Sequence, residues 1–170
     1  MKFDFPQVDL PCEILAWNDV TEDILNIYKQ SCRLKAGIFA ICTEGKMTAT
    51  INLIDYEIKP NDLITLLPGT IIQFRERTEK VRLCFAGFSS ECVERINLIK
   101  SMVSSFSKIT ECPIVELQED IASYLIDYFS LLARVTCDEK LSLPSEMTEV
   151  SLRSILTAVG LIYQLSLIHI

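Results

Sequence analysis

The sequence holds a single histidine among its 170 residues, and that residue, His169, stands next to the end. Metal sites of the kind found in β-barrels use two or three histidines together with a carboxylate. Nucleophilic serine or cysteine catalysis commonly needs an adjacent base, most often histidine. His169 cannot supply these sets alone, so we expect no metal, no cofactor and no enzymatic activity.

Three other features are missing. No apolar run approaches the roughly 18 residues that a membrane-spanning helix needs, and the first residues lack the apolar core of a signal peptide. Lysine and arginine do not cluster, and the net charge is −7 with a pI of about 4.8. Because phosphate contacts require clustered cations, we expect that this segment does not itself bind nucleic acid.

The cysteines also lack a pattern. They number seven, an odd count, and no Cys-x-x-Cys occurs. Their spacing does not fit a zinc site. Most stand in apolar runs, where a free thiol behaves as a small hydrophobic side chain. This use of cysteine is typical of a reducing compartment and predicts a cytoplasmic protein.

Apolar residues are plentiful, at 49% with a mean hydropathy of +0.30. The length suffices for one domain, or for a small domain with a helical extension. We interpret the apolar excess as buried surface, part of it facing a partner or a missing domain.

The first half of the chain has the pattern of short strands. Lys59-Pro60-Asn61-Asp62 opens an apolar run that Pro68-Gly69 closes, and residues 46–53 alternate strictly between apolar and polar. Further strands are expected over 38–43, 55–58, 71–75 and 81–88. Asp62 is interpreted as a turn residue. Short strands at this spacing predict a sandwich or a barrel.

After Ser89 the period changes to that of helices. Ser89 or Ser90 is a candidate N-cap for a first helix that carries Val93 to Phe106. A second helix is expected to begin near Ile114, and a third after Pro144. Strands followed by helices predict an α+β fold.

With these elements in place, the chain resembles the N-terminal effector-binding and dimerisation domain of AraC-type bacterial transcription regulators, in a Bacteroidetes-like branch. The resemblance rests on Gly37 to Phe88, with Glu44-Gly45-Lys46 as a hairpin and Asn61-Asp62 to Pro68-Gly69 as the turn-to-turn motif. It implies a cupin-type β-barrel (jelly roll) followed by two to three helices. Metal-binding cupins carry a histidine just after Pro-Gly, where this chain has Ile71 and Ile72.

The resemblance implies a pocket for a small effector inside the barrel. The corresponding positions are Phe5 (or Pro6) in the arm, Arg33, Phe74 after Pro-Gly, and Leu83 and Phe85 on the last strand. Because the residues on that last strand are apolar, a sugar is not the expected ligand. Arg33 either neutralises an anionic ligand or is solvated, and the aromatic residues either contact ligand or pack in a filled core.

The last helix is the candidate for homodimerisation, because similar proteins pair a helix at this place. Its apolar side is broad, which indicates contacts with more than one neighbour. The alternative is a helix buried against a missing C-terminal domain. The residues predicted to supply both core and dimer contacts are Leu152, Ile155, Leu156, Val159 and Tyr163.

The predicted organisation is an arm over 1–12, a barrel over 13–88 and a helical dimerisation region over 89–164. Residues 165–170, Leu-Ser-Leu-Ile-His-Ile, match the translation of a sequencing-library adaptor, and we expect the natural chain to continue past Gln164 into a DNA-binding domain. The predicted function is the sensor and dimerisation half of a transcription regulator, with a small effector, a second copy and, through the absent domain, DNA as partners. The alternatives are a stand-alone cupin-like binding protein or isomerase, and a structural dimeriser with a filled barrel.

Overall fold

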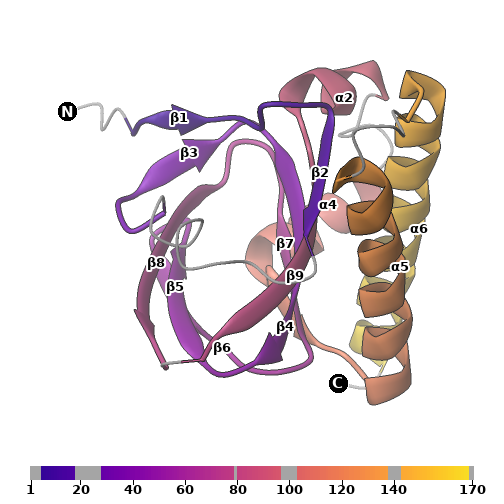
Figure 1. Cartoon of the computed structure of the whole chain (residues 1–170). Helices are drawn as coiled ribbons and strands as arrows, with labels where there is room; N and C mark the ends of the chain where they lie inside the picture. The colour runs from indigo at the N-terminus through magenta and orange to yellow at the C-terminus, as the bar shows by residue number, and fades with distance from the viewer. Residues whose placement is uncertain (1–4, 18–27, 79, 97–102, 138–142, 169–170) are drawn as a thin grey trace.

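A computed structural model describes residues 5–17, 28–78, 80–96, 103–137 and 143–168 (Figure 1). The described strands form two five-stranded sheets that face each other, and the described helices lie on one side of the pair. The predicted fold class, α+β with strands in two facing sheets followed by helices, is confirmed. The predicted domain boundaries stay predictions.

The sheet that lies away from the helices, sheet A, contains the strand that begins the described chain. Its only parallel pair among the described strands joins β1 to β3, and the other pairs are antiparallel. Its strands, in spatial order, are β1 (Gln7–Val8), β3 (Cys32–Leu34), β8 (Ile71–Arg77), β5 (Met47–Ile51) and β6 (Ile54–Ile58).

The second sheet, sheet B, is antiparallel throughout and lies between sheet A and the helices. Its strands, in spatial order, are β10 (Ile114–Glu116), β7 (Asp62–Leu66), β4 (Gly37–Glu44), β9 (Arg82–Phe88) and β2 (Ile14–Trp17).

The apolar run on β4 follows from burial of sheet B on both faces. Phe39 and Ile41 belong to the core shared with the helices, whereas Ala40 and Cys42 belong to the core between the sheets. Successive side chains of a strand point to opposite faces, so a strand covered on both faces needs apolar residues at every position. On β5, in contrast, only Met47, Ala49 and Ile51 are buried, which gives the alternation seen in the sequence.

Two predicted turns form as expected. Gly45 joins β4 to β5 with φ at 81°, and a Cβ atom there would stand 2.1 Å from the carbonyl oxygen of Lys80, so only glycine fits. Before β7, the buried carboxylate of Asp62 accepts hydrogen bonds from the backbone nitrogen of Lys59 at 2.9 Å and from its ammonium at 3.2 Å. Asp62 is the first residue of β7 and, as predicted, hydrogen-bonds the turn at the start of this strand.

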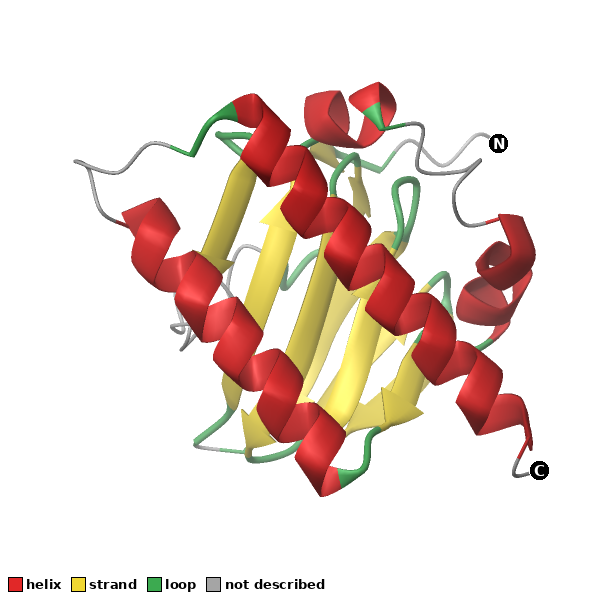
Figure 2. Cartoon of the chain, turned by 90° about the vertical axis from the view of Figure 1, so that its right-hand side faces the viewer, coloured by secondary structure: helices red, strands yellow, loops and turns green. Residues whose placement is uncertain are grey.

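The described helices are α2 (Ser90–Arg95), α4 (Val103–Glu111), α5 (Glu119–Cys137) and α6 (Ser145–Ile168). Ser89 is the predicted N-cap, and its hydroxyl accepts from the backbone nitrogen of Cys92 at 3.4 Å. The long α5 and α6 cross the outer face of sheet B (Figure 2). No described helix combines the length and apolar character that crossing a membrane requires.

Two helix predictions were wrong in detail. The first predicted helix is divided, because α2 ends at Arg95 and α4 begins at Val103. The second does not begin near Ile114, because residues 114–116 pair with β7 as the edge strand β10 and the helix starts only at Glu119. Two β-branched residues, Ile114 and Val115, favour the strand locally.

The five residues predicted for the dimer contact on α6 all lie in the chain's own core. Their exposed fractions run from 0% to 6%, and they pack with sheet B and α5. The Tyr163 hydroxyl donates to the carbonyl oxygen of Cys112 at 2.6 Å. These side chains take part in the chain's own core, as predicted in part, and their second role as partner contacts stays a prediction. Leu152, Ile155, Leu156, Val159 and Tyr163 are core residues in this chain.

We predict that Phe129→Ala in α5 lowers the free energy of unfolding by about 3–5 kcal/mol, because the fully buried ring fills the space between α5 and sheet B. Leu131→Ala in the same helix is the control and should change it by less than about 0.5 kcal/mol, because Leu131 is exposed. Urea denaturation followed by circular dichroism measures both. Equal losses in the two variants would contradict the assigned orientation of α5.

Candidate ligand pocket between the sheets

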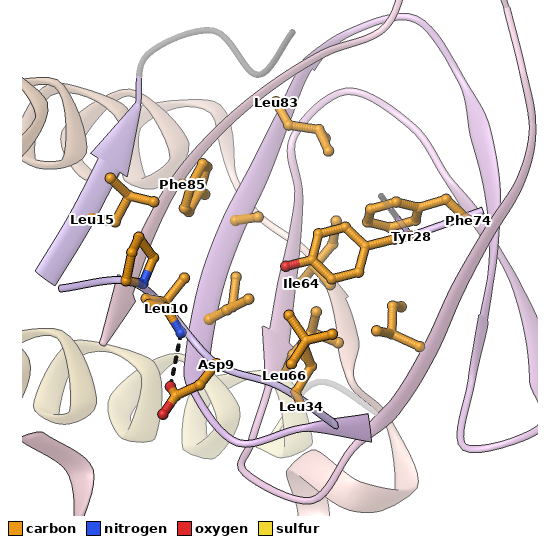
Figure 3. A pocket seen from close by; sticks show the side chains of 15 residues that line it. Asp9, Leu10, Leu15, Tyr28, Leu34, Ile64, Leu66, Phe74, Leu83 and Phe85 are labelled. Carbon is orange, nitrogen blue, oxygen red and sulfur yellow. Dashed lines mark hydrogen bonds between the residues drawn. The ribbon is translucent and has the colours of Figure 1, made fainter. Parts of the chain in front are cut away.

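A pocket of about 280 Å³ lies between the two sheets. Its walls come from both sheets and from the arm, defined as residues 5–12 (Figure 3). The lining is almost wholly apolar. The residues that line it are Val8, Asp9, Leu10, Pro11, Leu15, Tyr28, Leu34, Ile38, Ala40, Ile64, Leu66, Ile72, Phe74, Leu83 and Phe85.

Strand alternation places these side chains. On β9, Leu83 and Phe85 point into the pocket, whereas Cys84 and Ala86 belong to the helix-side core. Gly87 has no side chain, and a Cβ atom there would stand 2.8 Å from a terminal methyl of Leu10. The glycine thus leaves the room in which the arm packs against sheet B.

The arm forms one wall of the pocket and is held by backbone hydrogen bonds. The backbone nitrogen of Arg33 donates to the carbonyl of Pro6, and that of Lys35 donates to the carbonyl of Val8, both at 2.8 Å. Farther along, the carboxylate of Asp9 accepts from the backbone nitrogen of Ser90 at 3.1 Å and from its hydroxyl at 2.5 Å. The arm is therefore tied to sheet A and to the start of α2.

The pKa of Asp9 reflects these contacts. Partial burial raises the pKa of this carboxyl, but the hydrogen bonds from Ser90 and the positive charge of Lys35 outweigh burial, and the net pKa is lowered. The carboxylate is therefore charged at neutral pH and already satisfied on both oxygens.

Tyr28 and Phe74 make an aromatic corner on the opposite wall. Their rings meet edge to face, with centroids 5.7 Å apart, and the backbone nitrogen of Phe74 donates to the carbonyl of Tyr28 at 2.8 Å. Figure 3 shows the Tyr28 hydroxyl directed across the pocket. Burial raises the pKa of Tyr28, so the hydroxyl stays a neutral donor. Within the described part of the chain this hydroxyl has no hydrogen-bond partner.

The structure brings together three of the five predicted ligand residues. Phe74, Leu83 and Phe85 line the pocket. Arg33 and Phe5 are not among the lining residues, and a guanidinium nitrogen of Arg33 donates to the carbonyl of Gly69 at 3.0 Å. Ligand binding by each of these five residues stays a prediction.

Tyr28 and the arm residues Val8 to Pro11 were missed by the sequence reasoning, apart from the general expectation that the arm covers the pocket. Tyr28 precedes β3 in a stretch with no strand alternation, so no periodic signal pointed to it. The adjacent prolines and phenylalanines mark the arm as irregular but do not indicate which of its side chains turn inward.

The buried thiols on the two faces of sheet B stay protonated at neutral pH. Burial raises the pKa of Cys42 to about 11 and that of Cys84 to about 12. A nucleophilic cysteine needs its thiolate form, which these groups do not provide. Among the described residues, no group of three histidine, cysteine or acidic side chains is placed to hold a metal ion.

An ion-pair network connects the start of β2 with the helices. The guanidinium of Arg95, the last residue of α2, binds Glu13 through one nitrogen and Glu149 of α6 through Nε at 2.9 Å. The hydroxyl of Ser145, the first residue of α6, donates to Glu13 at 3.3 Å. The hydrogen bond from Arg95 lowers the pKa of Glu13. The chain that follows the arm is thereby linked to both helices.

A second hollow, a groove between α5 and α6, opens on the outer surface. It is lined by Tyr124, Leu125, Tyr128, Ser154, Ile155, Thr157, Ala158 and Leu161. Tyr124 and Leu161 are 67% and 55% exposed. The inner faces of α5 and α6 are buried in the core, and apolar side chains are also exposed on their outer faces.

Comparison with known proteins finds similarity to solved structures and not to sequences. No family model and no curated protein sequence matches the chain. Similar solved structures include the AraC-like transcriptional activator CuxR, with 10% identity and a TM-score of 0.41 over 86% of this chain and 47% of that one. ToxT from Vibrio cholerae gives 10% identity and a TM-score of 0.39 over 89% and 53%.

A further ToxT structure, with (E)-4-(8-methylnaphthalen-1-yl)but-3-enoic acid bound, gives 10% identity and a TM-score of 0.43 over 89% of this chain and 57% of that one. The chain therefore spans about half the length of the solved proteins that it resembles.

We predict that Asp9→Ala loosens the arm. At pH 7, the amides of Arg33 and Lys35, which donate to the arm, should exchange roughly threefold faster, a modest effect because the contact is solvent-exposed. Hydrogen exchange followed by NMR measures this. Asp55→Ala, which removes a carboxylate bonded to Thr50 in the β5–β6 hairpin, is the control and should leave both amides unchanged.

The pH dependence has a defined sign. Because the folded-state pKa of Asp9 is lowered, its contribution is complete above the ordinary value of 3.8 and is lost as the pH falls through the lower folded value. Protection of the Arg33 and Lys35 amides should fall in that acidic range in the parent chain but not in Asp9→Ala. Identical pH profiles would contradict the role of Asp9.

Proposed function

We propose that this chain is the effector-binding part of a transcription regulator of the AraC type and that the effector binds between the two sheets without metal chemistry. The observation that carries the proposal is the pocket of about 280 Å³, which is lined by both sheets and the arm. Concave, mostly apolar pockets with a few polar groups are the usual form of small-molecule sites. The regulator assignment draws on the sequence resemblance of Gly37 to Phe88.

The arm offers a physical route from pocket to helices. A ligand that contacts Leu10 and Pro11 touches the segment whose Asp9 is bonded to Ser90 of α2. Arg95, at the other end of α2, is bonded to Glu149 of α6. A ligand that stabilises the docked arm therefore favours one arrangement of α2 and α6, by no more than its difference in affinity between the two states.

DNA contact belongs, in this proposal, to a segment outside these 170 residues. The chain carries a net charge of −7, which opposes binding to the phosphate backbone. The role of the described residues is to sense the effector and to set how the DNA-binding parts are held.

We also propose that two copies pair through the groove between α5 and α6. Tyr124 and Leu161 are exposed on this face, and Tyr128, which also packs against the core, lines the same groove. In a two-fold dimer the same surface of each copy contacts the other, so a small apolar patch contributes twice to the interface. These residues are further candidates for the contact beside the five predicted from the sequence, of which Ile155 also lines the groove.

We predict that Ala40→Phe abolishes binding of a small apolar probe, because the added ring fills the pocket from the middle of β4. The probe is prodan, a neutral naphthyl ketone whose fluorescence shifts to the blue on leaving water. Its affinity should fall by at least about tenfold, since a filled pocket leaves a bulky ligand no space. Thr48→Phe adds the same ring on the outward side of β5 and is the control.

Trp17, the only tryptophan, reports where the probe binds. It pairs directly with Phe85 across β2 and β9, so both side chains lie on the pocket side of sheet B. Energy transfer from Trp17 to bound prodan is expected in the parent and in Thr48→Phe, and not in Ala40→Phe. Unchanged binding to Ala40→Phe would remove the pocket as the site and with it the proposed function.

We predict that Leu161→Glu shifts the chain from dimer toward monomer, because it places a charge at the centre of the proposed contact. Sedimentation velocity at micromolar concentration measures the change. Leu53→Glu is the matched control, since Leu53 is 70% exposed on the β5–β6 turn, away from α5 and α6. A parent chain that sediments as a monomer, or equal effects of the two variants, would contradict this interface.

A further inference from the structure

We propose that the pocket selects a neutral, largely apolar ligand of about two fused rings, donates one hydrogen bond to it from the Tyr28 hydroxyl, and rejects carboxylates. This inference deepens the proposed function and rests on it. It follows from the size of the pocket, the charges around it and the one unpartnered polar group in its described wall.

Size sets the first limit. An apolar protein cavity of about 150 Å³ holds one benzene molecule. The pocket between the sheets has about 280 Å³, close to twice that space. The space suits a compact group with two rings, or an aliphatic group of similar volume.

Charge sets the second limit. Asp9 is the only charged residue in the described lining, and its oxygens already accept hydrogen bonds from Leu10 and Ser90. Lys35 lies near Asp9, and the guanidinium of Arg33 donates to Gly69, but neither lines the pocket.

A carboxylate ligand would therefore lose its hydration without gaining a cation. An ionised group placed in apolar surroundings without a partner carries a large desolvation cost. The negative charge of Asp9 at the wall adds repulsion. A neutral ligand carries neither penalty, so the same carbon skeleton should bind more tightly as a ketone than as an acid.

Tyr28 supplies the one specific contact. Its ring is held edge to face against Phe74, which limits its rotation, and its hydroxyl is directed across the pocket toward the wall that holds Leu10 and Phe85 (Figure 3). The described residues give this hydroxyl no partner. A ligand oxygen placed there accepts its hydrogen bond, while the rings of Phe74 and Phe85 offer aromatic faces and edges to a flat ligand.

The test compares three molecules of one skeleton by isothermal titration calorimetry at pH 7: naphthalene, 2-acetylnaphthalene and 2-naphthoate. The ketone should bind about five- to tenfold more tightly than the hydrocarbon, the range expected for one hydrogen bond in a dry site. The carboxylate should bind at least about tenfold more weakly than the ketone, because its charge has no partner.

Tyr28→Phe isolates the hydrogen bond. It should remove the advantage of the ketone over naphthalene and leave naphthalene affinity unchanged, because the ring against Phe74 remains. Tyr124→Phe, on the exposed face of α5, is the matched control and should keep the advantage. Unfolding temperatures of both variants close to that of the parent show that any change is local.

The possible results distinguish failure of the inferred ligand class from failure of the proposed sensor function. If 2-naphthoate binds as tightly as the ketone, or the ketone keeps its advantage in Tyr28→Phe, the inferred ligand class is wrong and the sensor proposal stands. If none of the three molecules binds and prodan does not bind, the pocket is not a small-molecule site and both proposals fail.

Discussion

Burial of sheet B on both faces is the constraint on which the rest of the structure depends. One face carries the large side chains Phe39, Ile41 and Phe88, which pack under α5 and α6. The other carries Ala40, Ile64 and Phe85, which face sheet A. A strand such as β4 cannot shift its register by one residue without exchanging these two sets. The same strands therefore position the helix layer and the pocket. A shift of a strand that moves side chains on one face of sheet B also moves those on the other.

The arm and Arg95 complete this arrangement at one end of the molecule. The arm reaches the pocket with Val8 and Leu10 and reaches α2 with Asp9. Arg95 then joins Glu13, close to the arm, with Glu149 on α6. These contacts are polar and partly exposed, so each is weaker than a core contact. A connection of this kind suits a segment that exchanges between docked and released states at modest free-energy cost.

Much of the fold was predictable because a strand buried on one face and a strand buried on both faces leave different patterns in the sequence. Alternation on β5 and the turns at Gly45, Asp62 and Gly69 are local signals that survive in the folded chain. The pocket was predictable only in part, since Phe74, Leu83 and Phe85 stand on regular strands whereas Tyr28 and Leu10 reach it from irregular segments. Ile114–Glu116 was misassigned because its pairing with β7 is a contact between residues about 50 positions apart, which no short-range period encodes. The apolar breadth of α6 is evident in the sequence, but a sequence does not say which part of a broad apolar face the chain's own sheet will cover.

The pocket between the sheets is the feature that supports the proposal of a ligand. Closed cavities between packed side chains lower stability in proportion to their volume, and the pocket between the sheets, which is partly open, has about 280 Å³. Water relieves little of this cost, because a water molecule needs polar partners and the lining offers few. Replacing Ala40 with a larger apolar residue is a small change that would fill the space. In the proposed sensor, Ala40 on β4 and a Tyr28 hydroxyl without a partner among the described residues leave room and one hydrogen-bond donor for a ligand.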